Sequence, residues 1–341
     1  MAASPAERMS RRYSRRTVEV RDPHAELLAD FRAGMLEAPR SLPPKYFYDA
    51  RGSALFDAIC DTPEYYPTRL EASLLERNAA AIIEAAGADT LVELGSGTSR
   101  KTEYLLAPLE RAAGEESLYV ANDVCPEILD EAGERLLERF PGLTIHALAG
   151  DYGAALEALR ADGAAGQDGA RLFTFLGSSL GNFEDPEAIE LLRAIRRTMG
   201  SDDHLLLGLD RVKPVDVLEA AYDDAAGVTA AFNLNLLSVL NRELGADFDE
   251  RGFRHRAPFN HEESRIEMHL VAQVSQKVRV EAFATTLELE AGEVIRTEIS
   301  RKFDAKMIDR LLSASGLRRE REWLAGDGWY SLLMLRPDPA G

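Results

Sequence analysis

Apolar and polar residues follow each other along the middle of the chain in the pattern of strands that alternate with helices. Residues 90–94 form an apolar run that ends a strand, and residues 104–106 lie in the helix that opens after two glycines. The same pattern predicts further strands at residues 117–123, 144–149, 171–176 and 204–209. Repeated units of one strand and one helix predict an α/β fold with a largely parallel sheet.

The pattern changes after Asp210. Helical spacing gives way to the alternating positions of antiparallel strands, at residues 265–271, 277–289 and 294–303. The core pattern then returns in a helix and two strands near the C-terminus. We therefore predict a nucleoside-binding core from residues 71–210 and 304–341, an inserted domain at 211–303 and an N-terminal arm at 21–70.

Residues 1–20 form a basic segment with few apolar positions. The arginines in and next to it are Arg8, Arg11, Arg12, Arg15, Arg16 and Arg21. A segment that buries little apolar surface cannot offset the entropy lost when its chain is ordered. We therefore predict a disordered tail here, without the apolar core of a signal sequence.

Composition narrows the range of partners. The 341 residues carry a formal net charge of −18, which argues against nucleic acid or an anionic membrane surface. Residues 228–240, a long apolar stretch, are interrupted by Asn233 and Asn235, so we expect no membrane-spanning helix. Cys60 and Cys125 lie far apart without cysteine or histidine neighbours, so neither a disulfide nor a metal site is expected. These features predict a soluble, cytoplasmic protein that handles small molecules, and we expect a monomer.

The turn after the first core strand has the form Glu93-x-Gly95-x-Gly97. Glycines let the backbone approach a ligand closely, and the helix that follows offers free N–H groups. The motif lacks the third glycine of a dinucleotide site and the Gly-Lys-Ser/Thr of an ATP site, so a diphosphate is not expected. Glu93 favours a cationic or hydroxyl-bearing ligand, and S-adenosylmethionine has both an ammonium group and a ribose. The alternative is a turn that serves helix packing alone.

Polar side chains end the next strands. Asp123 closes the second strand, where nucleoside-binding folds place the carboxylate that holds ribose hydroxyls. Asp151 and Tyr152 follow the third strand and suit an adenine, although an aspartate there is equally suited to cap a helix. The fourth strand runs into the polar loop 177–183, at the sheet edge where such folds bind ligands.

Aromatic residues are concentrated in the N-terminal arm. Tyr48, Phe56 and Tyr65 belong to this stretch, which spans residues 42–69. One interpretation is that the rings only fasten the arm to the core. The tyrosine hydroxyls also suit a binding site, so both interpretations stay open on the pattern alone.

The motifs taken together resemble one known family. The chain closely resembles the L-histidine Nα-methyltransferases of ergothioneine biosynthesis in Leu42-Pro-Pro-Lys-Tyr-Phe-Tyr-Asp, Pro63-Glu-Tyr-Tyr-Pro-Thr-Arg, Leu91-Val-Glu-Leu-Gly-Ser-Gly-Thr-Ser, Phe175-Leu-Gly-Ser-Ser-Leu-Gly-Asn, Ala221-Tyr-Asp-Asp-Ala-Ala-Gly-Val-Thr-Ala-Ala-Phe-Asn and Arg265-Ile-Glu-Met. The resemblance implies a Rossmann-like class I methyltransferase with a seven-stranded sheet, and a second α+β substrate-binding domain formed by the arm and the insertion. It implies that S-adenosylmethionine trimethylates the α-amine of L-histidine to give hercynine.

The resemblance also assigns residues to the site. It implies a donor set of Gly95, Lys101, Asp123, Asp151 and Tyr152. It implies that the histidine carboxylate is held by Asn182 and Tyr222, and the imidazole by Tyr65, Glu298 and Ser300. The rest of the acceptor pocket would be lined by Tyr48, Phe56, Gly177, Thr229 and Met268. The basic pair Arg301-Lys302 is a local departure, since family members can be less charged there.

Three alternative functions remain at this stage. The acceptor can be another amino acid or a peptide α-amine. A nicotinamide-dependent oxidoreductase also has a glycine turn, but it is expected to show a fuller Gly-x-Gly-x-x-Gly. A non-catalytic nucleoside-binding regulator would not need the acceptor residues. Separately, Glu298 can belong to a solvated strand face beside Arg296. For the enzyme, no residue is an obvious strong base, so we expect the amine proton to leave through water near Tyr48 or the Gly177 carbonyl.

Overall fold

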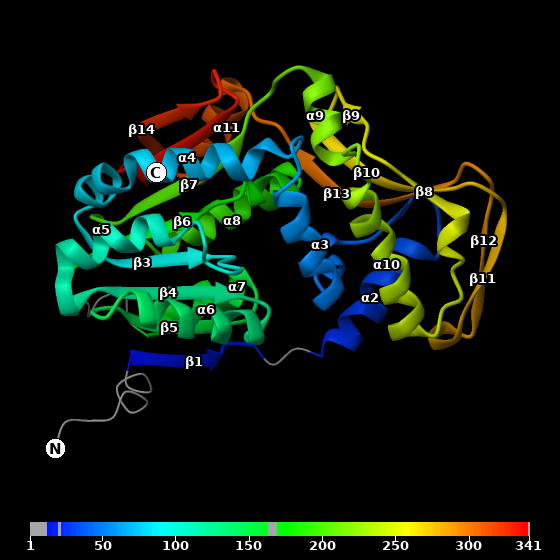
Figure 1. Ribbon diagram of the computed structural model, residues 1–341, viewed down its shortest axis with the longest axis horizontal. Coiled ribbons are helices and arrows are strands. Elements are labelled where there is room, and N and C mark those ends of the chain that lie inside the picture. Colours follow the sequence, from blue (N-terminus) through cyan, green and yellow to red (C-terminus); the bar gives the residue numbers. More distant parts are fainter. Residues whose placement is uncertain (1–11, 20–21, 163–168, 340–341) are drawn as a thin grey trace. The chain divides into compact units, whose positions relative to one another are not determined.

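The computed structural model describes residues 12–19, 22–162 and 169–339, which form two compact units. The first unit draws its described residues from Met1–Val20, Leu70–Arg211 and Phe303–Gly341, and the second from Arg21–Arg69 and Val212–Lys302. Each unit therefore combines stretches that are far apart in the sequence, and each has a sheet of its own (Figure 1).

The first unit is built on an eight-stranded sheet with the order β1-β5-β4-β3-β6-β7-β15-β14. Its strands are β1 (Tyr13–Thr17), β3 (Ala88–Leu94), β4 (Leu118–Asp123), β5 (Thr144–Ala149), β6 (Ala170–Phe175), β7 (His204–Asp210), β14 (Leu317–Ala325) and β15 (Tyr330–Pro337). All neighbours from β1 to β7 pair parallel, whereas β15 is antiparallel to both β7 and β14. The carboxyl ends of the parallel strands therefore share one edge, where open α/β sheets bind ligands.

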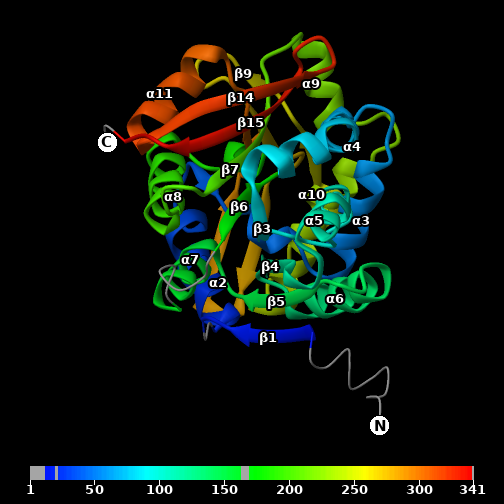
Figure 2. The ribbon, with the colours of Figure 1, turned by 90° about the vertical axis from the view of Figure 1, so that its left-hand side faces the viewer.

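Helices cover both faces of this sheet (Figure 2). One apolar cluster joins the sheet to α4 (Tyr66–Ala86), α5 (Glu103–Ala113) and α6 (Pro126–Arg139). A second cluster joins it to α7 (Tyr152–Ala161), α8 (Asp185–Thr198) and α11 (Ala305–Ser315). Because successive side chains of a strand point to opposite faces, the neighbours Leu91 and Val92 enter different clusters. The predicted α/β fold with a largely parallel sheet is confirmed.

The sheet contains the seven strands expected of a class I methyltransferase, and β1 adds an eighth. This strand corrects the predicted disordered tail within residues 12–19. It pairs parallel with β5, from Tyr13 opposite Ile145 to Thr17 opposite Ala149. The Tyr13 ring packs against Gly133 of α6, where a Cβ would collide with it.

Arg12, directly before β1, and the two arginines of β1 have partners that the composition of this segment does not reveal. Arg15 pairs with Asp130 at 2.9 Å and Arg16 with Asp162 at 2.6 Å. The Arg12 guanidinium donates to backbone carbonyls that follow α6, including that of Pro141 at 2.8 Å. Complementary acidic and carbonyl groups therefore order this basic segment. The predicted tail residues before residue 12, with Arg8 and Arg11, and also Arg21, lie outside the described residues.

The second unit joins the N-terminal arm to the segment after Arg211. Its five-stranded sheet has the order β2-β13-β10-β8, with β9 beside β10, and a separate pair is formed by β11 and β12. The strands are β2 (Arg40–Ser41), β8 (Phe253–Arg256), β9 (Phe259–Asn260), β10 (Arg265–Ala272), β11 (Gln276–Val280), β12 (Thr285–Leu289) and β13 (Val294–Arg301). The helices are α2 (Pro23–Met35), α3 (Ala50–Cys60), α9 (Val215–Tyr222) and α10 (Val228–Leu244). The arm enters the sheet through β2, which pairs parallel with β13.

Single-turn 3-10 helices interrupt the loops at Pro44–Phe47, Gly114–Glu116, Ser179–Asn182, Glu250–Gly252 and Glu281–Phe283. The buried polar positions of α10 bind neighbouring strands: Asn233 accepts a hydrogen bond from Thr297 at 2.7 Å and donates to the His269 carbonyl at 3.1 Å. Among residues 12–19, 22–162 and 169–339, no helix combines the length and the apolar character that crossing a membrane requires.

Candidate active site

The glycine turn lies between β3 and α5, at the carboxyl edge of the first unit's sheet. Gly95 and Gly97 have φ angles of 72° and 48°, in the left-handed region that favours glycine. The Gly95 and Ser96 amides donate to the Asn122 carbonyl at 2.9 and 2.8 Å, which fastens the turn to the end of β4. A Cβ on Gly95 would lie 3.0 Å from the Tyr152 hydroxyl. The turn is therefore a cradle that a side chain at residue 95 would fill.

Asp123 faces this cradle from the end of β4. Its carboxylate accepts hydrogen bonds from the Gly97 amide at 2.9 Å and the Cys125 amide at 3.0 Å. Burial raises the pKa of the Asp123 carboxyl, while these backbone donors act in the opposite direction. The group is thus an oriented acceptor beside the glycine turn, as a ribose-binding carboxylate must be.

Asp151 and Tyr152 follow β5 on the same edge. Asp151 caps α7 by accepting from the Ala154 amide at 2.7 Å, so the capping alternative describes its observed contact. The Tyr152 ring meets Phe175 edge to face at 5.3 Å. Burial and the nearby carboxyls of Asp123 and Asp151 raise the pKa of Tyr152. The structure therefore brings together Gly95, Asp123 and Tyr152, three of the residues predicted for the donor site.

Glu93 lies beneath the turn, and its contacts differ from those expected of a ligand-facing acid. Its carboxylate accepts from the Thr102 hydroxyl at 2.6 Å and from the Tyr119 hydroxyl. Tyr119 also contacts the Ser99 hydroxyl at 2.9 Å. Burial raises the pKa of Glu93 to about 7, and the hydrogen bonds from Thr102 and Tyr119 oppose that shift. The observed role of Glu93 is therefore to fasten the cradle to α5 and β4.

Glu71 of α4 is a buried centre that the sequence analysis did not predict. Its carboxylate accepts from the Gly177 amide at 2.8 and 3.0 Å, from the Tyr330 hydroxyl at 2.6 Å and from the Lys101 ammonium. It thereby fixes two predicted site residues, Lys101 and Gly177, at one edge of the sheet. The available signal was a charged residue on the apolar face of a helix, one turn before Leu74 and Leu75.

The loop after β6 holds Gly177 and Asn182. Gly177 has a φ of 75°, and Ser178 is also left-handed at 56°. The Ser178 hydroxyl accepts from the Asp210 amide at 2.9 Å, so the loop is tied to the end of β7. Asn182 ends the 3-10 helix that follows. Two anchors, Glu71 and Ser178, thus hold the backbone of this loop in one conformation.

The aromatic arm residues gather within the second unit. Tyr48 meets Phe56 edge to face at 5.7 Å, and the Phe56 ring lies 6.3 Å from Tyr65. Tyr65 in turn meets Tyr222 at 5.9 Å. Burial raises the pKa of Tyr65. The rings predicted for the acceptor pocket therefore form one connected series, although contact among aromatic rings is also what a purely structural role requires.

The polar residues of the second unit that are predicted for the acceptor site lie on β13 and at the starts and ends of helices. The Tyr222 hydroxyl, at the end of α9, lies 2.7 Å from the Ser300 hydroxyl. Burial raises the pKa of Glu298 to about 7, and the positive charge of Lys302 opposes the shift. Met268 of β10 is buried and stands opposite Glu298 in the sheet. Thr229 is buried in the first turn of α10, where its amide donates to Asp224 at 2.7 Å.

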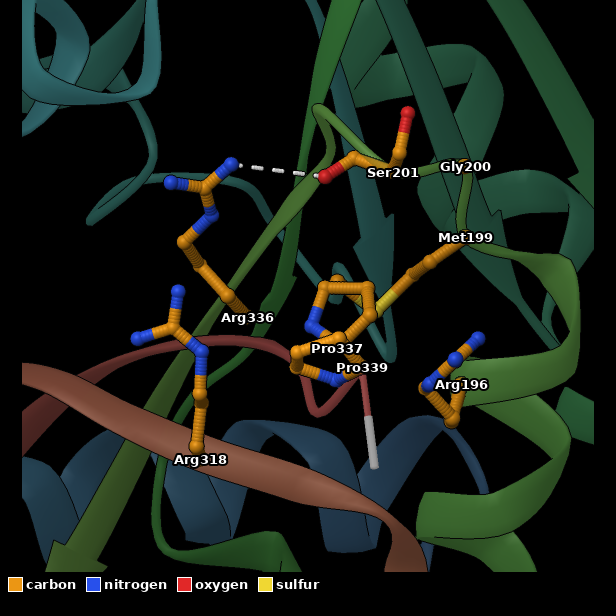
Figure 3. Close-up of a pocket in the computed structure, with 8 residues that line it drawn as sticks. All are labelled: Arg196, Met199, Gly200, Ser201, Arg318, Arg336, Pro337 and Pro339. Atoms are coloured by element: carbon orange, nitrogen blue, oxygen red, sulfur yellow. Dashed lines mark hydrogen bonds between the residues drawn. The ribbon is translucent and has the colours of Figure 1, made fainter. Parts of the chain in front are cut away.

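A cavity of about 320 Å³ lies at the other edge of the first unit's sheet (Figure 3). It adjoins the start of β7 and the end of β15, and Arg336 there donates to the Ser201 carbonyl at 3.4 Å. Among the described residues that line it, none is a predicted site residue. The described residues also contain no group of three or more histidine, cysteine, aspartate or glutamate side chains that could hold a metal ion.

The parallel sheet, its glycine cradle and the carboxylate at the end of β4 define an S-adenosylmethionine-dependent methyltransferase of class I. Residues 27–337 match the sequence profile of the histidine-specific, S-adenosylmethionine-dependent methyltransferases. The chain belongs to this family.

Individual relatives extend the comparison. The chain is 48% identical over 314 residues to the histidine N-alpha-methyltransferase of Mycolicibacterium smegmatis. The alignment covers 91% of this chain and 96% of that protein. It is 45% identical to the protein of the same name from Mycobacterium tuberculosis, covering 91% and 95% of the two chains. The ergothioneine biosynthesis protein 1 of Neurospora crassa is 29% identical over 88% of this chain, which corresponds to 33% of that protein.

Proposed function

We propose that this protein transfers three methyl groups from S-adenosylmethionine to the α-amine of L-histidine, giving hercynine for ergothioneine biosynthesis. The observation that carries the proposal is the 48% identity to a histidine N-alpha-methyltransferase over nearly the full length of both chains. The match includes the arm and the insertion as well as the common methyltransferase sheet. Similarity that extends beyond the donor-binding fold supports the same acceptor.

The donor set proposed from the sequence comprises Gly95, Lys101, Asp123, Asp151 and Tyr152. The cradle fits S-adenosylmethionine in its chemistry, because Gly95 leaves room beside Tyr152 and Asp123 is an acceptor for ribose hydroxyls. When bound, this donor supplies a methyl group on a sulfonium, which is a good leaving group. The protein needs no metal for such a transfer, and we propose none.

The acceptor set anchors histidine at both ends. Asn182 and Tyr222 hold its carboxylate, while Tyr65, Glu298 and Ser300 hold its imidazole. The remaining pocket consists of Tyr48, Phe56, Gly177, Thr229 and Met268. The arm and the insertion together thus form the substrate-binding domain. Fixing both ends of a small substrate orients its amine, and orientation of this kind lowers the activation barrier of group transfer substantially.

Two further tasks fall to residues of the acceptor set. The amine must lose a proton before each transfer, and either the Tyr48 hydroxyl or the Gly177 carbonyl is suitable to orient a water that removes it. The product is a permanent cation, for which the rings of Tyr48 and Phe56 are favourable neighbours. Glu71 supports the first task because it fixes the Gly177 backbone.

The proposal also covers the setting of the enzyme. A formal net charge of −18 disfavours nucleic acid and anionic membranes as partners. Cys60 and Cys125 form no disulfide in the described part of the chain, which suits a reducing cytoplasm, and we propose that the protein works there as a monomer. Analytical ultracentrifugation of the purified chain tests the monomer directly.

Mass spectrometry of histidine incubated with the protein and S-adenosylmethionine tests the function. We expect products with one, two and three added methyl groups and accumulation of the trimethylated form. Nα-acetylhistidine, whose α-nitrogen is blocked, is the matched control and is expected to remain unmodified. Methylation of that control would place the reaction on the imidazole, and absence of any transfer to histidine with efficient transfer to another amino acid would change the acceptor.

A further inference from the structure

Lys302 is a fully buried lysine beside the proposed acceptor residues of the second unit, with 0% of its surface exposed. Its ammonium donates to the Ser300 hydroxyl at 2.8 Å and to the Tyr222 hydroxyl at 3.0 Å. The ammonium also lies 4.5 Å from the centroid of the Tyr222 ring. Because the two hydroxyls are themselves 2.7 Å apart, the three groups form a closed triangle.

The backbone holds this triangle in place. Glu298 and Ser300 lie near the end of β13, and Lys302 directly follows its last residue. The three occupy alternate positions of the chain, so their side chains share one face. The Lys302 amide donates to the Ser264 carbonyl at 2.8 Å, which continues the pairing beyond the strand. The Tyr222 carbonyl contacts the His255 ring at 2.7 Å, which fixes the end of α9. The arrangement of Lys302, Ser300 and Tyr222 is therefore fixed by the backbone of the sheet and of α9.

A buried ammonium changes the hydroxyls that accept from it. An ammonium can only donate, so both hydroxyls are acceptors in their contacts with Lys302. One hydroxyl donates to the other across their 2.7 Å contact, which leaves the second hydroxyl proton for a ligand. Donation from a charged group polarises a hydroxyl and makes it a stronger donor, and the effect is larger where water is absent. The positive charge of the ammonium also attracts an anion that binds to these hydroxyls.

We propose that Lys302 is a positioning residue that makes the acceptor site selective for a carboxylate, acting through the hydroxyl of Tyr222, which it contacts both directly and through the Ser300 hydroxyl. The inference rests on the proposed function, because it takes Tyr222 as a partner of the histidine carboxylate. It assigns to Lys302 the preference for an amino acid over the corresponding amine. The opposing effect of Lys302 on the raised pKa of Glu298 is consistent with a cation that acts on this face of β13.

Competition between histidine and histamine tests the proposal, since histamine keeps the imidazole and the amine but lacks the carboxylate. Equal concentrations of both are incubated with enzyme and S-adenosylmethionine, and the methylated products give the ratio of the two kcat/KM values. For Lys302→Met we expect this ratio to fall roughly ten- to hundredfold, the range for loss of a charge-assisted contact. A merely structural role would lower both rates together and leave the ratio unchanged.

Lys213→Met is a matched control. Lys213 is also a buried lysine of the second unit that donates to a tyrosine hydroxyl, that of Tyr66 at 2.8 Å, with its ammonium over the ring. Its removal is expected to leave the ratio at the wild-type value. Binding of S-adenosylhomocysteine, measured by calorimetry, is expected to be near normal in both variants.

Lys302→Gln keeps the test decisive if the methionine variant does not fold. Glutamine retains an N–H donor without the charge, so the proposal requires its ratio to fall as well. A wild-type ratio in a folded Lys302→Met or Lys302→Gln variant would overturn the inference while leaving the proposed function intact. Failure of the wild-type enzyme to prefer histidine would instead refute the carboxylate site itself.

Discussion

At the scale of single residues, Glu298 is the carboxylate on which acceptor choice depends in the proposed site. Burial raises its pKa to about 7, and the carboxylate form, which predominates above that pH, accepts a hydrogen bond from the imidazole of histidine in the proposed site. Removing the partner of a buried polar group costs about 1–3 kcal/mol. Glu298→Ala is therefore expected to lower the kcat/KM ratio of histidine to phenylalanine or tryptophan by roughly tenfold or more. Competition assays followed by mass spectrometry measure this ratio.

Glu267→Ala provides the control for Glu298→Ala. Glu267 is a carboxylate of β10 in the same sheet, where it accepts from Arg265 at 2.8 Å. We expect this variant to keep the wild-type ratio, and both variants to bind S-adenosylhomocysteine normally. A Glu298→Ala enzyme that still prefers histidine as strongly as the wild type would leave Glu298 a structural residue of the strand.

Two acids of the first unit show what a sequence pattern can and cannot assign. Asp123 is predicted to lie at the glycine cradle because it ends a strand, and its carboxylate accepts a hydrogen bond from the Gly97 amide there. Glu93 was expected to favour a ligand because it lies in the same motif, yet it binds Thr102 and Tyr119. Strand alternation gives the face of a residue but not the hydroxyls that approach that face from other elements. Those partners become known only when the chain is folded.

At the scale of elements, the core strands were predictable because each is an apolar run bounded by polar or glycine residues. The contacts of Glu71 were not, since they join α4 to Gly177, Lys101 and Tyr330 from distant parts of the sequence. The strand β1 was missed for a similar reason. Its low apolar content predicts disorder when the segment is considered alone. The acidic groups that pair with it, Asp130 of α6 and Asp162 directly after α7, lie more than a hundred residues away.

Because β1 contacts α6, we predict that Gly133→Ala changes stability in opposite directions with and without the Tyr13 ring. Alanine is more favourable than glycine inside a helix by about 1 kcal/mol. Gly133→Ala is nevertheless expected to destabilise the protein, because the new Cβ would collide with the Tyr13 ring. In a Tyr13→Ala background the same change is expected to stabilise it. Denaturant unfolding of the four proteins measures the cycle, and stabilisation by Gly133→Ala alone would show that residues 13–17 do not pack there.

At the scale of the whole molecule, buried histidines and buried glutamates have opposite effects on how the stability of the fold depends on pH. Burial lowers the pKa values of His204, His255 and His269, so their contribution to stability is present above about 6.5 and is lost as the pH falls. Burial raises the pKa values of Glu93 and Glu298 to about 7, so their contribution is lost as the pH rises. The pH profile of the wild-type chain therefore sums two trends, and a single variant is needed to separate them.

The variant Glu93→Gln isolates the loss of stability with rising pH that is expected from the buried Glu93 carboxyl. Below pH 4.5 the Glu93 carboxyl is protonated in both the folded and the unfolded chain, and above about 7 it is charged in both. Between these values the folded chain keeps a proton that the unfolded chain has lost, so folding weakens as the pH rises. The wild type is expected to lose about 2–3 kcal/mol relative to Glu93→Gln between pH 5 and pH 8. The histidines cancel in this comparison because both proteins contain them.

Ser99→Ala, which breaks the neighbouring contact with Tyr119 without removing a titrating group, is expected to shift stability equally at both pH values. A wild type and a Glu93→Gln variant with parallel pH profiles in denaturant unfolding would show that the cradle holds Glu93 in its charged form throughout.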